Sequence, residues 1–228
     1  MSAPLRLVIF DVDGTLVDSQ GDILAAMAVA FEAVGLPLPP RADLLGMVGL
    51  SLEVIFPALV PEADAVTHRR MVDGYKDAYV TLRAQGGVAK SSPLYPGARE
   101  TLEALHAIPE VLLGVATGKS RRGLDKLIDG HGLDGLFVTQ HCADFHPSKP
   151  HPSMILAALS DTGVAAADAV VVGDTSFDME MAASAGVAGI GVSWGYHDRV
   201  RLGAQARLVI DGFDALHPAL DQVWGQRV

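Results

Sequence analysis

The sequence contains a single cysteine, few basic residues and no long apolar run. With Cys142 alone among 228 residues, no intramolecular disulfide framework can form, which suits a reducing compartment. The 17 lysine and arginine residues are outnumbered by 27 aspartate and glutamate residues, and the net charge is −10. Such a charge argues against binding to nucleic acid or to an anionic membrane. We therefore expect no nucleic-acid or membrane partner.

Membrane and targeting segments are also lacking. The longest run without a formal charge, residues 181–197, is interrupted by glycines and is shorter than the ~20 apolar residues that a membrane helix needs. The N-terminal stretch MSAPLRLVIFDVD has too short an apolar segment before Asp11 to be a signal peptide. We expect a soluble, cytoplasmic protein.

The sequence does contain alternating strand-like and helical patterns. Hydrophobic residues make up 50% of the chain and charged residues 19%, a globular composition. Apolar runs typical of strands buried on both faces occur at residues 5–10, 111–116, 136–138, 169–172, 189–192 and 208–210. Helical patterns lie between them, after Pro96-Gly97 and at residues 120–130, 152–159, 176–185 and 214–224. This alternation predicts an α/β fold with a Rossmann-like, doubly wound parallel sheet.

One region interrupts the alternation, because residues 18–91 show no convincing strand. A helical stripe runs from Ile23 to Val34, and either Asp18 or Ser19 is placed to cap it. A second stripe passes through Val66, Tyr75, Tyr79 and Leu82. We expect residues 18–91 to form a helical domain, inserted into a core made of residues 1–17 and 92–228.

Four polar motifs follow strand-like runs. They are FDVDGTLVDS with Asp11 and Asp13, TGK with Thr117 and Gly118, the loop SKPHP with Lys149, and GDTSFD with Asp174 and Asp178. Ligands of open α/β sheets bind outside the carboxyl ends of the strands, so these four motifs can converge on one crevice.

The residue types in these motifs suit phosphoryl transfer. Asp11, Asp13 and Asp174 offer hard oxygen ligands, and we expect three crowded carboxylates to share a Mg²⁺ ion. Lys149 and the Thr117 hydroxyl would bind phosphoryl oxygens. An ionised aspartate can attack phosphorus while a second carboxylate moves the proton of the leaving group.

The four motifs, in order and spacing, resemble those of the haloacid dehalogenase superfamily. The helical insertion, the segment LYPGARETLEAL and the later VSWGYH are similar to its phosphoglycolate-phosphatase-like subgroup, in which the insertion forms a cap. By this resemblance Asp11 is the nucleophile and a metal ligand. Asp13 is the general acid/base and gives its backbone carbonyl to Mg²⁺.

The resemblance also implies roles for the later motifs. Thr117 and Lys149 would bind the phosphoryl group, Asp174 would bind the metal directly, and Asp178 would support the lysine or metal-bound water. Gly118 stands where the family often has asparagine, so a backbone contact to phosphate is retained and a side-chain contact to substrate is not.

These features predict a Mg²⁺-dependent phosphatase acting on a small phosphorylated metabolite, with phosphoglycolate the nearest guess by resemblance. Asp13 argues against a dehalogenase or a phosphonate hydrolase. A phosphosugar mutase or a pyrophosphatase of the same superfamily remains an alternative, although GMVGLS at residues 46–51 lacks a basic residue suited to a sugar phosphate. A binding or regulatory protein on a phosphatase scaffold is a further alternative. We expect a monomer or a small homo-oligomer.

Other chemically notable residues have simpler interpretations. His141, His146 and His151 match no zinc spacing, and the nearby prolines indicate loop histidines. Cys142 is expected to be an inert, small hydrophobic residue. Arg121 and Arg122 border the predicted site, where they would either touch an anionic substrate or lie on a solvated helix face.

Overall fold

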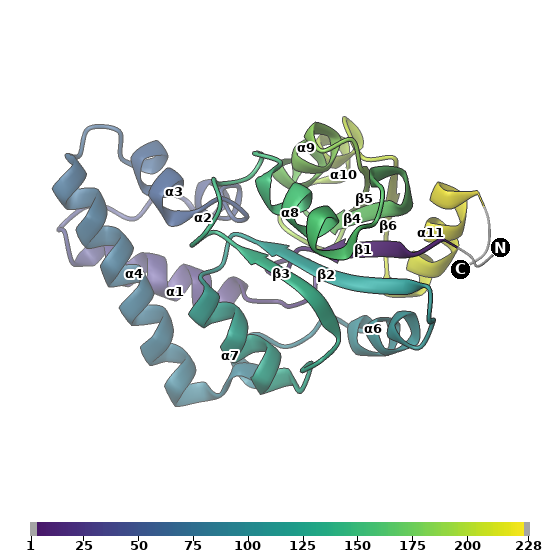
Figure 1. Cartoon of the computed structure of the whole chain (residues 1–228). Coiled ribbons are helices and arrows are strands. Elements are labelled where there is room, and N and C mark those ends of the chain that lie inside the picture. The colour runs from purple at the N-terminus through teal and green to yellow at the C-terminus, as the bar shows by residue number, and fades with distance from the viewer. Residues whose placement is uncertain (1–3, 226–228) are drawn as a thin grey trace.

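Six parallel strands form the centre of the molecule (Figure 1). The computed structural model describes residues 4–225, without the side chains of residues 83–86. The strands are β1 (Arg6–Phe10), β2 (Val111–Thr117), β3 (Phe137–Cys142), β4 (Ala169–Gly173), β5 (Ala188–Val192) and β6 (Leu208–Ile210). Their order is β3-β2-β1-β4-β5-β6, which is the arrangement of a doubly wound Rossmann-like sheet. The predicted α/β fold is confirmed.

Strand β1 shows why four apolar residues follow Arg6 without interruption. All five of its residues are buried, because helices cover both faces of the sheet. Val8 and Phe10 pack on the face covered by α6 (Ala98–His106), α7 (Arg121–His131) and α11 (Leu216–Trp224). Leu7 and Ile9 pack on the opposite face, under α8 (Ser153–Thr162) and α9 (Ser176–Ser184). Burial of one such side chain contributes roughly 1.5–3 kcal/mol, so the central strand anchors both layers.

The largest error in the predicted strands is at β3. The apolar run predicts residues 136–138, whereas the strand extends to Cys142. This strand lies at the edge of the sheet and pairs only with β2, so polar residues such as Thr139 and Gln140 are tolerated in it. A short helix before β6, α10 (Arg199–Gly203), also lacks a predicted counterpart.

The helices expected between residues 18 and 91 pack mainly on one another. They are α1 (Gln20–Glu32), α2 (Arg41–Leu45), α3 (Leu52–Leu59), α4 (Ala65–Gly86) and the short α5 (Val88–Ser91). Residues of α1 to α4 share a hydrophobic cluster, in which the rings of Phe31 and Phe56 lie 6.1 Å apart. Val66 does not belong to it, since it is exposed, so the predicted stripe of α4 begins later. Figure 1 shows these helices to one side of the sheet.

The chain passes between the two hydrophobic regions at adjacent places. The backbone N–H of Asp18 donates to the carbonyl of Pro93 at 2.9 Å, and Ser92 Oγ donates to Asp22 Oδ2 at 3.2 Å. Val88 already packs against the hydrophobic cluster of the sheet, whereas Tyr79 belongs to the helical cluster. The division into a core and a domain of residues 18–91 stays a prediction.

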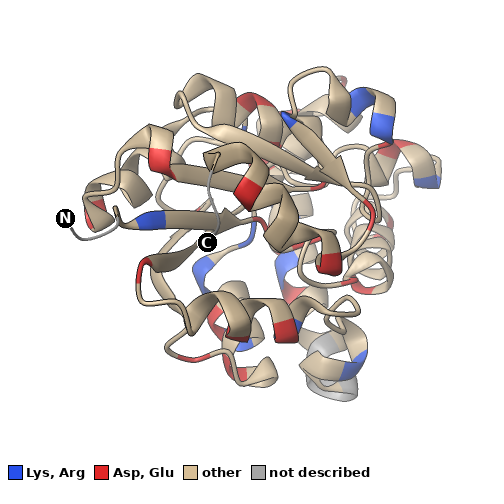
Figure 2. Ribbon diagram, turned by 90° about the vertical axis from the view of Figure 1, so that its right-hand side faces the viewer, with Lys and Arg blue, Asp and Glu red and all other residues tan. Residues whose placement is uncertain are grey.

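Charged residues of both signs are scattered over many helices and strands (Figure 2). None of the helices within residues 4–225 has the length and apolar character that crossing a bilayer would require.

Candidate active site

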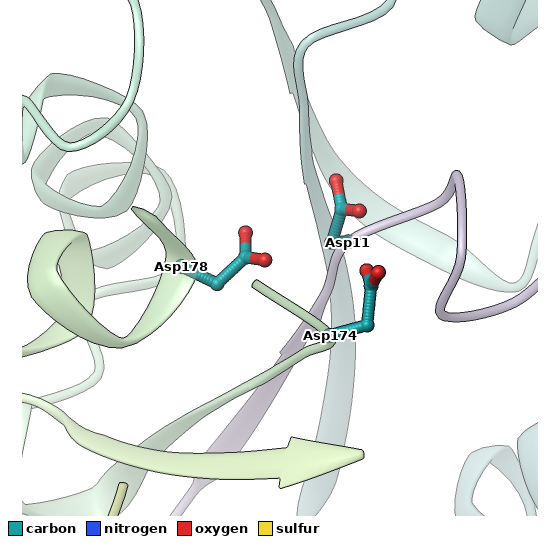
Figure 3. A group of neighbouring side chains, drawn as sticks. All are labelled: Asp11, Asp174 and Asp178. Atoms are coloured by element: carbon teal, nitrogen blue, oxygen red, sulfur yellow. The ribbon is translucent and has the colours of Figure 1, made fainter. Parts of the chain in front are cut away.

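Three aspartates lie together at the carboxyl ends of β1 and β4. Asp11 follows β1, and its N–H donates to Val172 O of β4 at 2.9 Å. Asp174 follows β4, and Asp178 lies in the first turn of α9. One carboxylate oxygen of each lies within 4.8 Å of the others, and all three residues are buried (Figure 3). Because the sheet reverses its winding between β1 and β4, this is the place where open α/β sheets bind ligands.

Lys149 is the cation of this group. Its Nζ donates to Asp11 Oδ1 at 2.5 Å and to Asp178 Oδ1 at 2.6 Å, and its side chain is fully buried. Burial alone would lower the pKa of Lys149, but the two carboxylates outweigh that effect and raise it. The lysine is therefore charged, and it fixes one oxygen of the Asp11 carboxylate.

The carboxylates outnumber this single cation, which makes a further positive charge favourable. Burial, together with the charges of Asp178 and Asp13, raises the pKa of Asp11 to about 7 against the lowering effect of Lys149. Burial and the charges of Asp11 and Asp178 likewise raise the pKa of Asp174. A divalent cation among these oxygens would stabilise their ionised forms.

The two carboxylate oxygens of Asp178 bond to different partners. Oδ2 accepts from the N–H and the hydroxyl of Thr175, at 3.0 and 2.7 Å, and the N–H of Asp178 donates to Thr175 Oγ1 at 3.3 Å. This reciprocal pair is a capping box that begins α9. Oδ1 is left for Lys149. Asp178 thus lies in the first turn of a helix and bonds to Lys149, and its supporting role in the reaction stays a prediction.

Asp174 is held by the first motif and by VSWGYH. Thr15 Oγ1 donates to its Oδ1 at 2.9 Å, and the N–H of Tyr196 donates to its Oδ2 at 2.8 Å. Gly14 makes this approach feasible: its φ is +86°, and a Cβ there would lie 2.3 Å from Asp174 Oδ2. Gly14 and Thr15 of the first motif thus fit the position of Asp174.

The carboxylate of Asp13 lies apart from this group. Both of its oxygens accept from Lys119 Nζ, at 2.6 and 2.7 Å, and Ser19 Oγ also donates to it. The expectation that Asp11, Asp13 and Asp174 crowd together is therefore corrected to Asp11, Asp174 and Asp178. Asp13 has its own cation, so it does not need to share a metal through its side chain. Its backbone carbonyl as a metal ligand stays a prediction.

Lys119 is the site residue that sequence reasoning missed. It is the lysine of the TGK motif and is buried, and besides Asp13 it donates to Tyr79 OH of α4 at 3.0 Å. Of the two residues predicted to cap α1, Asp18 accepts from the N–H of Gln20 at 3.3 Å, whereas the Ser19 hydroxyl bonds to Asp13 and makes no capping bond. One feature of the sequence could have indicated that Lys119 lies in the site: it follows the threonine at the end of a predicted strand by two residues.

Thr117 and Gly118 end β2 beside the helical region. Thr117 is buried, and its Oγ1 accepts from the N–H of Lys119 at 3.2 Å. A Cβ at position 118 would lie 2.6 Å from the carbonyl oxygen of Gly49, so only glycine allows this close approach of two backbones. This contact gives a physical reason for glycine where the family often has asparagine.

A cavity of about 300 Å³ opens beside Asp11. Its core side includes Asp11, Asp13, Thr117, Gly118 and Lys119, and its helical side includes Ile23, Met27, Leu52, Ile55, Tyr75 and Tyr79. Most of the predicted site residues therefore face one space between the sheet and the inserted helices. Lys149, Asp174 and Asp178 lie behind Asp11 in the buried polar group.

The donor set fits a hard divalent cation. The buried Oδ2 of Asp11 has no hydrogen-bond partner among the described residues, although a buried carboxylate oxygen normally has one. Together with Asp174 it offers oxygen donors of the kind that Mg²⁺ prefers. The residues present therefore fit a magnesium ion.

The other notable residues are placed as follows. His141 belongs to β3 and not to a loop, as a correction to the prediction, and its ring lies 3.0 Å from both His146 and Asp161. Burial raises the pKa of Cys142, as expected of an inert thiol. Arg121 pairs with Asp125 at 2.7 Å on the surface of α7, whereas Arg122 lines the cavity.

Comparison with known proteins identifies the fold and the chemistry. Residues 8–192 match the haloacid dehalogenase-like hydrolase family. The chain belongs to this family. Among its relatives, a Dickeya dadantii protein named "Probable phosphatase IndB" is 36% identical over 210 residues, which are 91% of this chain and 90% of the relative. A phosphoglycolate phosphatase of Agrobacterium fabrum is 33% identical over 221 residues, 96% and 94% of the two chains.

A solved hydrolase structure agrees with this fold. A hydrolase from Pseudomonas syringae superposes with a TM-score of 0.83 at 27% identity, covering 95% of this chain and 98% of that one. The family resemblance seen in the four motifs is confirmed, and the chain is a phosphatase enzyme of the haloacid dehalogenase-like family.

Proposed function

We propose that this phosphatase is Mg²⁺-dependent and hydrolyses a small phosphomonoester through an aspartyl-phosphate on Asp11. The observation that carries the proposal is the Asp11 carboxylate itself. One oxygen is fixed by the buried ammonium of Lys149, and the other is buried without a hydrogen-bond partner among the described residues. A carboxylate oriented in this way at the floor of a cavity is suited to nucleophilic attack.

The first step would transfer the phosphoryl group to Asp11. A carboxylate oxygen of Asp11 forms the new bond to phosphorus, and the bond from phosphorus to the alcohol oxygen breaks. Asp13, which enters this step protonated, gives the alcohol oxygen its proton. In the second step Asp13 takes a proton from a water molecule, whose oxygen attacks phosphorus. Asp11 is released with inorganic phosphate, and both aspartates return to their starting state.

The remaining residues would bind the transferred group and the ion. Thr117, the backbone of Gly118 and Lys149 would hold phosphoryl oxygens, while Asp178 keeps Lys149 in place. Asp11, Asp174 and the backbone carbonyl of Asp13 would hold Mg²⁺. When bound, the ion supplies positive charge that offsets the carboxylates and the phosphoryl group.

The substrate would be a small phosphorylated metabolite. Phosphoglycolate is the first compound to test, because several relatives are named for its hydrolysis. A mutase has less support, since Val48, Gly49 and Leu50 bring no cationic side chain to the cavity from residues 46–51. A pure binding protein would not need Asp11, Lys149 and Asp174 assembled as they are. A cytoplasmic location belongs to this proposal and agrees with the buried free thiol of Cys142.

The experiment is steady-state hydrolysis of p-nitrophenyl phosphate, with and without Mg²⁺, by the wild-type chain and by Asp11→Asn. We expect EDTA to abolish turnover and Mg²⁺ to restore it. Asp11→Asn should lose activity to background, because an amide is not a nucleophile of comparable strength. Folding of the variant is checked by circular dichroism. Turnover near the wild-type rate by folded Asp11→Asn, or full activity in EDTA, would contradict the proposal.

A further inference from the structure

The cavity beside Asp11 has a polar floor and an apolar wall. Asp11, Asp13, Thr117 and Lys119 form the polar part, where the phosphoryl group is proposed to sit. The facing wall comes from α1, α3 and α4. It includes Ile23, Met27, Leu52, Ile55, Tyr75 and Tyr79. An alcohol group attached to the phosphate would therefore lie against hydrocarbon and aromatic side chains.

This wall is well packed. Ile23, Met27 and Ile55 are buried members of the hydrophobic cluster of the inserted helices. The rings of Tyr75 and Tyr79 stack with 5.7 Å between centroids and 20° between planes. The hydroxyl of Tyr79 is bonded to Lys119. A preformed surface of this kind favours a flat or compact apolar group, because little ordering is needed when it binds.

The cationic residues of the cavity lining are already paired or lie away from the apolar wall. Lys76 of α4 pairs with Glu53 of α3 at 3.3 Å, and Lys119 is held by Asp13. Arg122 and Lys126 come from α7, at the core side of the cavity, and both are exposed. A carboxylate on the alcohol would have to turn toward these two residues, and the apolar wall would then stay in contact with water.

The size of the cavity also favours an alcohol group larger than a two-carbon acid. Its volume of about 300 Å³ lies at the lower end of pockets that enclose drug-sized ligands. A two-carbon acid would leave much of this space and most of the apolar wall unfilled. Each uncovered apolar group forgoes the free energy that its burial would contribute.

We infer that this chain prefers phosphomonoesters whose alcohol carries a flat, uncharged ring over phosphoglycolate, the ester of a two-carbon acid. This inference rests on the proposed phosphatase activity and names the alcohol part of its substrate. The ring would lie against Tyr75 and Leu52, which line the cavity and are partly exposed, with the phosphate at Asp11.

The test compares esters whose leaving groups are similarly basic alkoxides, so that cleavage of the phosphorus–oxygen bond is equally demanding. Phenethyl phosphate carries a ring and ethyl phosphate does not, and phosphoglycolate is the acidic comparison. We expect kcat/KM in Mg²⁺ to be ~10–100-fold higher for phenethyl phosphate than for ethyl phosphate, from burial of one ring. Phosphoglycolate should be no better than ethyl phosphate.

Two variants on α3 show whether the wall causes the preference. Leu52 is half-buried and lines the cavity, whereas Val54, two residues away, is exposed and is not part of its lining. Leu52→Asn should reduce the ratio of kcat/KM between phenethyl and ethyl phosphate ~3–10-fold, while Val54→Asn leaves it unchanged. If Leu52→Asn does not fold, Leu52→Ala replaces it.

The outcomes separate the inference from the proposed function. If the wild-type chain with Mg²⁺ hydrolyses no phosphomonoester, the proposed function is overturned. Hydrolysis of all three esters with phosphoglycolate fastest, and with that advantage lost in Arg122→Gln, would overturn the inference and leave the phosphatase intact. A wild-type ratio near one between phenethyl and ethyl phosphate would overturn it as well.

Discussion

At the scale of single residues, Asp13 differs from the other aspartates of the site. Its carboxylate is held by Lys119 and Ser19, and it faces the cavity, whereas Asp174 and Asp178 lie in the buried group behind Asp11. This separation suits two different chemical roles. Under the proposed function, the buried group would hold the nucleophile and the metal, and Asp13 would move a proton at the alcohol oxygen.

The role of Asp13 is tested by Asp13→Asn with two esters. An alkyl alkoxide needs a proton to leave, and general acid catalysis typically contributes ~10²–10⁴-fold, so kcat/KM for an alkyl phosphate should fall by about that factor. A nitrophenolate leaves readily without a proton, so the loss for p-nitrophenyl phosphate should be much smaller. The measurement is the ratio of the two losses in a folded variant that still binds Mg²⁺. Equal losses would show that Asp13 acts by holding Lys119 and Ser19 in place.

At the scale of elements, His197 joins the loop after β5 to two other parts of the fold. Its Nδ1 accepts from the N–H of Ser176, the first residue of α9, at 2.9 Å. Its Nε2 lies 3.1 Å from the carbonyl of Gly46, next to α2. Because an amide can only donate and a carbonyl can only accept, the ring is neutral with its proton on Nε2. The contact thus ties the inserted helices to the core.

This arrangement predicts a pH-dependent contribution to stability. Burial lowers the pKa of His197 below the 6.5 of an unperturbed histidine. Above that value the residue is neutral in both states, and its contacts contribute fully. As the pH falls below 6.5, the unfolded chain takes up a proton that the folded chain resists, and this contribution is lost.

The measurement compares urea unfolding of the wild-type chain and His197→Gln at two pH values. We expect the variant to be less stable by about 1–2 kcal/mol at pH 7.5, with a smaller difference near pH 5. The exposed His106→Gln serves as the control for removing a histidine, and it should match the wild-type chain. A difference between wild type and His197→Gln that grows on acidification would contradict the assignment of a neutral ring.

At the scale of the whole molecule, the sequence predicts the arrangement of strands and helices better than it predicts which side chains contact one another. Apolar runs such as residues 111–116 reveal buried strands, and the rule for parallel sheets then brings Asp11 and Asp174 to one edge. The partner of Asp13 is 106 residues away, so no local pattern connects it with Lys119. Likewise, the stripe of α4 shows that Tyr79 is buried but not that it meets Lys119, because this depends on how the helices pack against the sheet.

The last prediction concerns the binding of Mg²⁺ to the folded chain. A ligand that binds only the folded state stabilises it by about 2.7 kcal/mol at a hundredfold excess over its Kd. For a chain of this size that corresponds to a rise in Tm of about 5–11 °C. We expect Mg²⁺ to produce such a rise in the wild-type chain, since the ion would offset the buried charges of Asp11, Asp174 and Asp178.

Two variants with the same change of charge locate the ion. Asp174→Asn removes one of the three buried carboxylates and should abolish most of the rise in Tm. Asp134→Asn removes an exposed carboxylate outside this group and should leave the rise unchanged. This readout needs no turnover, so it tests the metal site independently of the substrate. If Mg²⁺ raises the Tm of Asp174→Asn as much as that of Asp134→Asn, the ion binds elsewhere on this acidic chain.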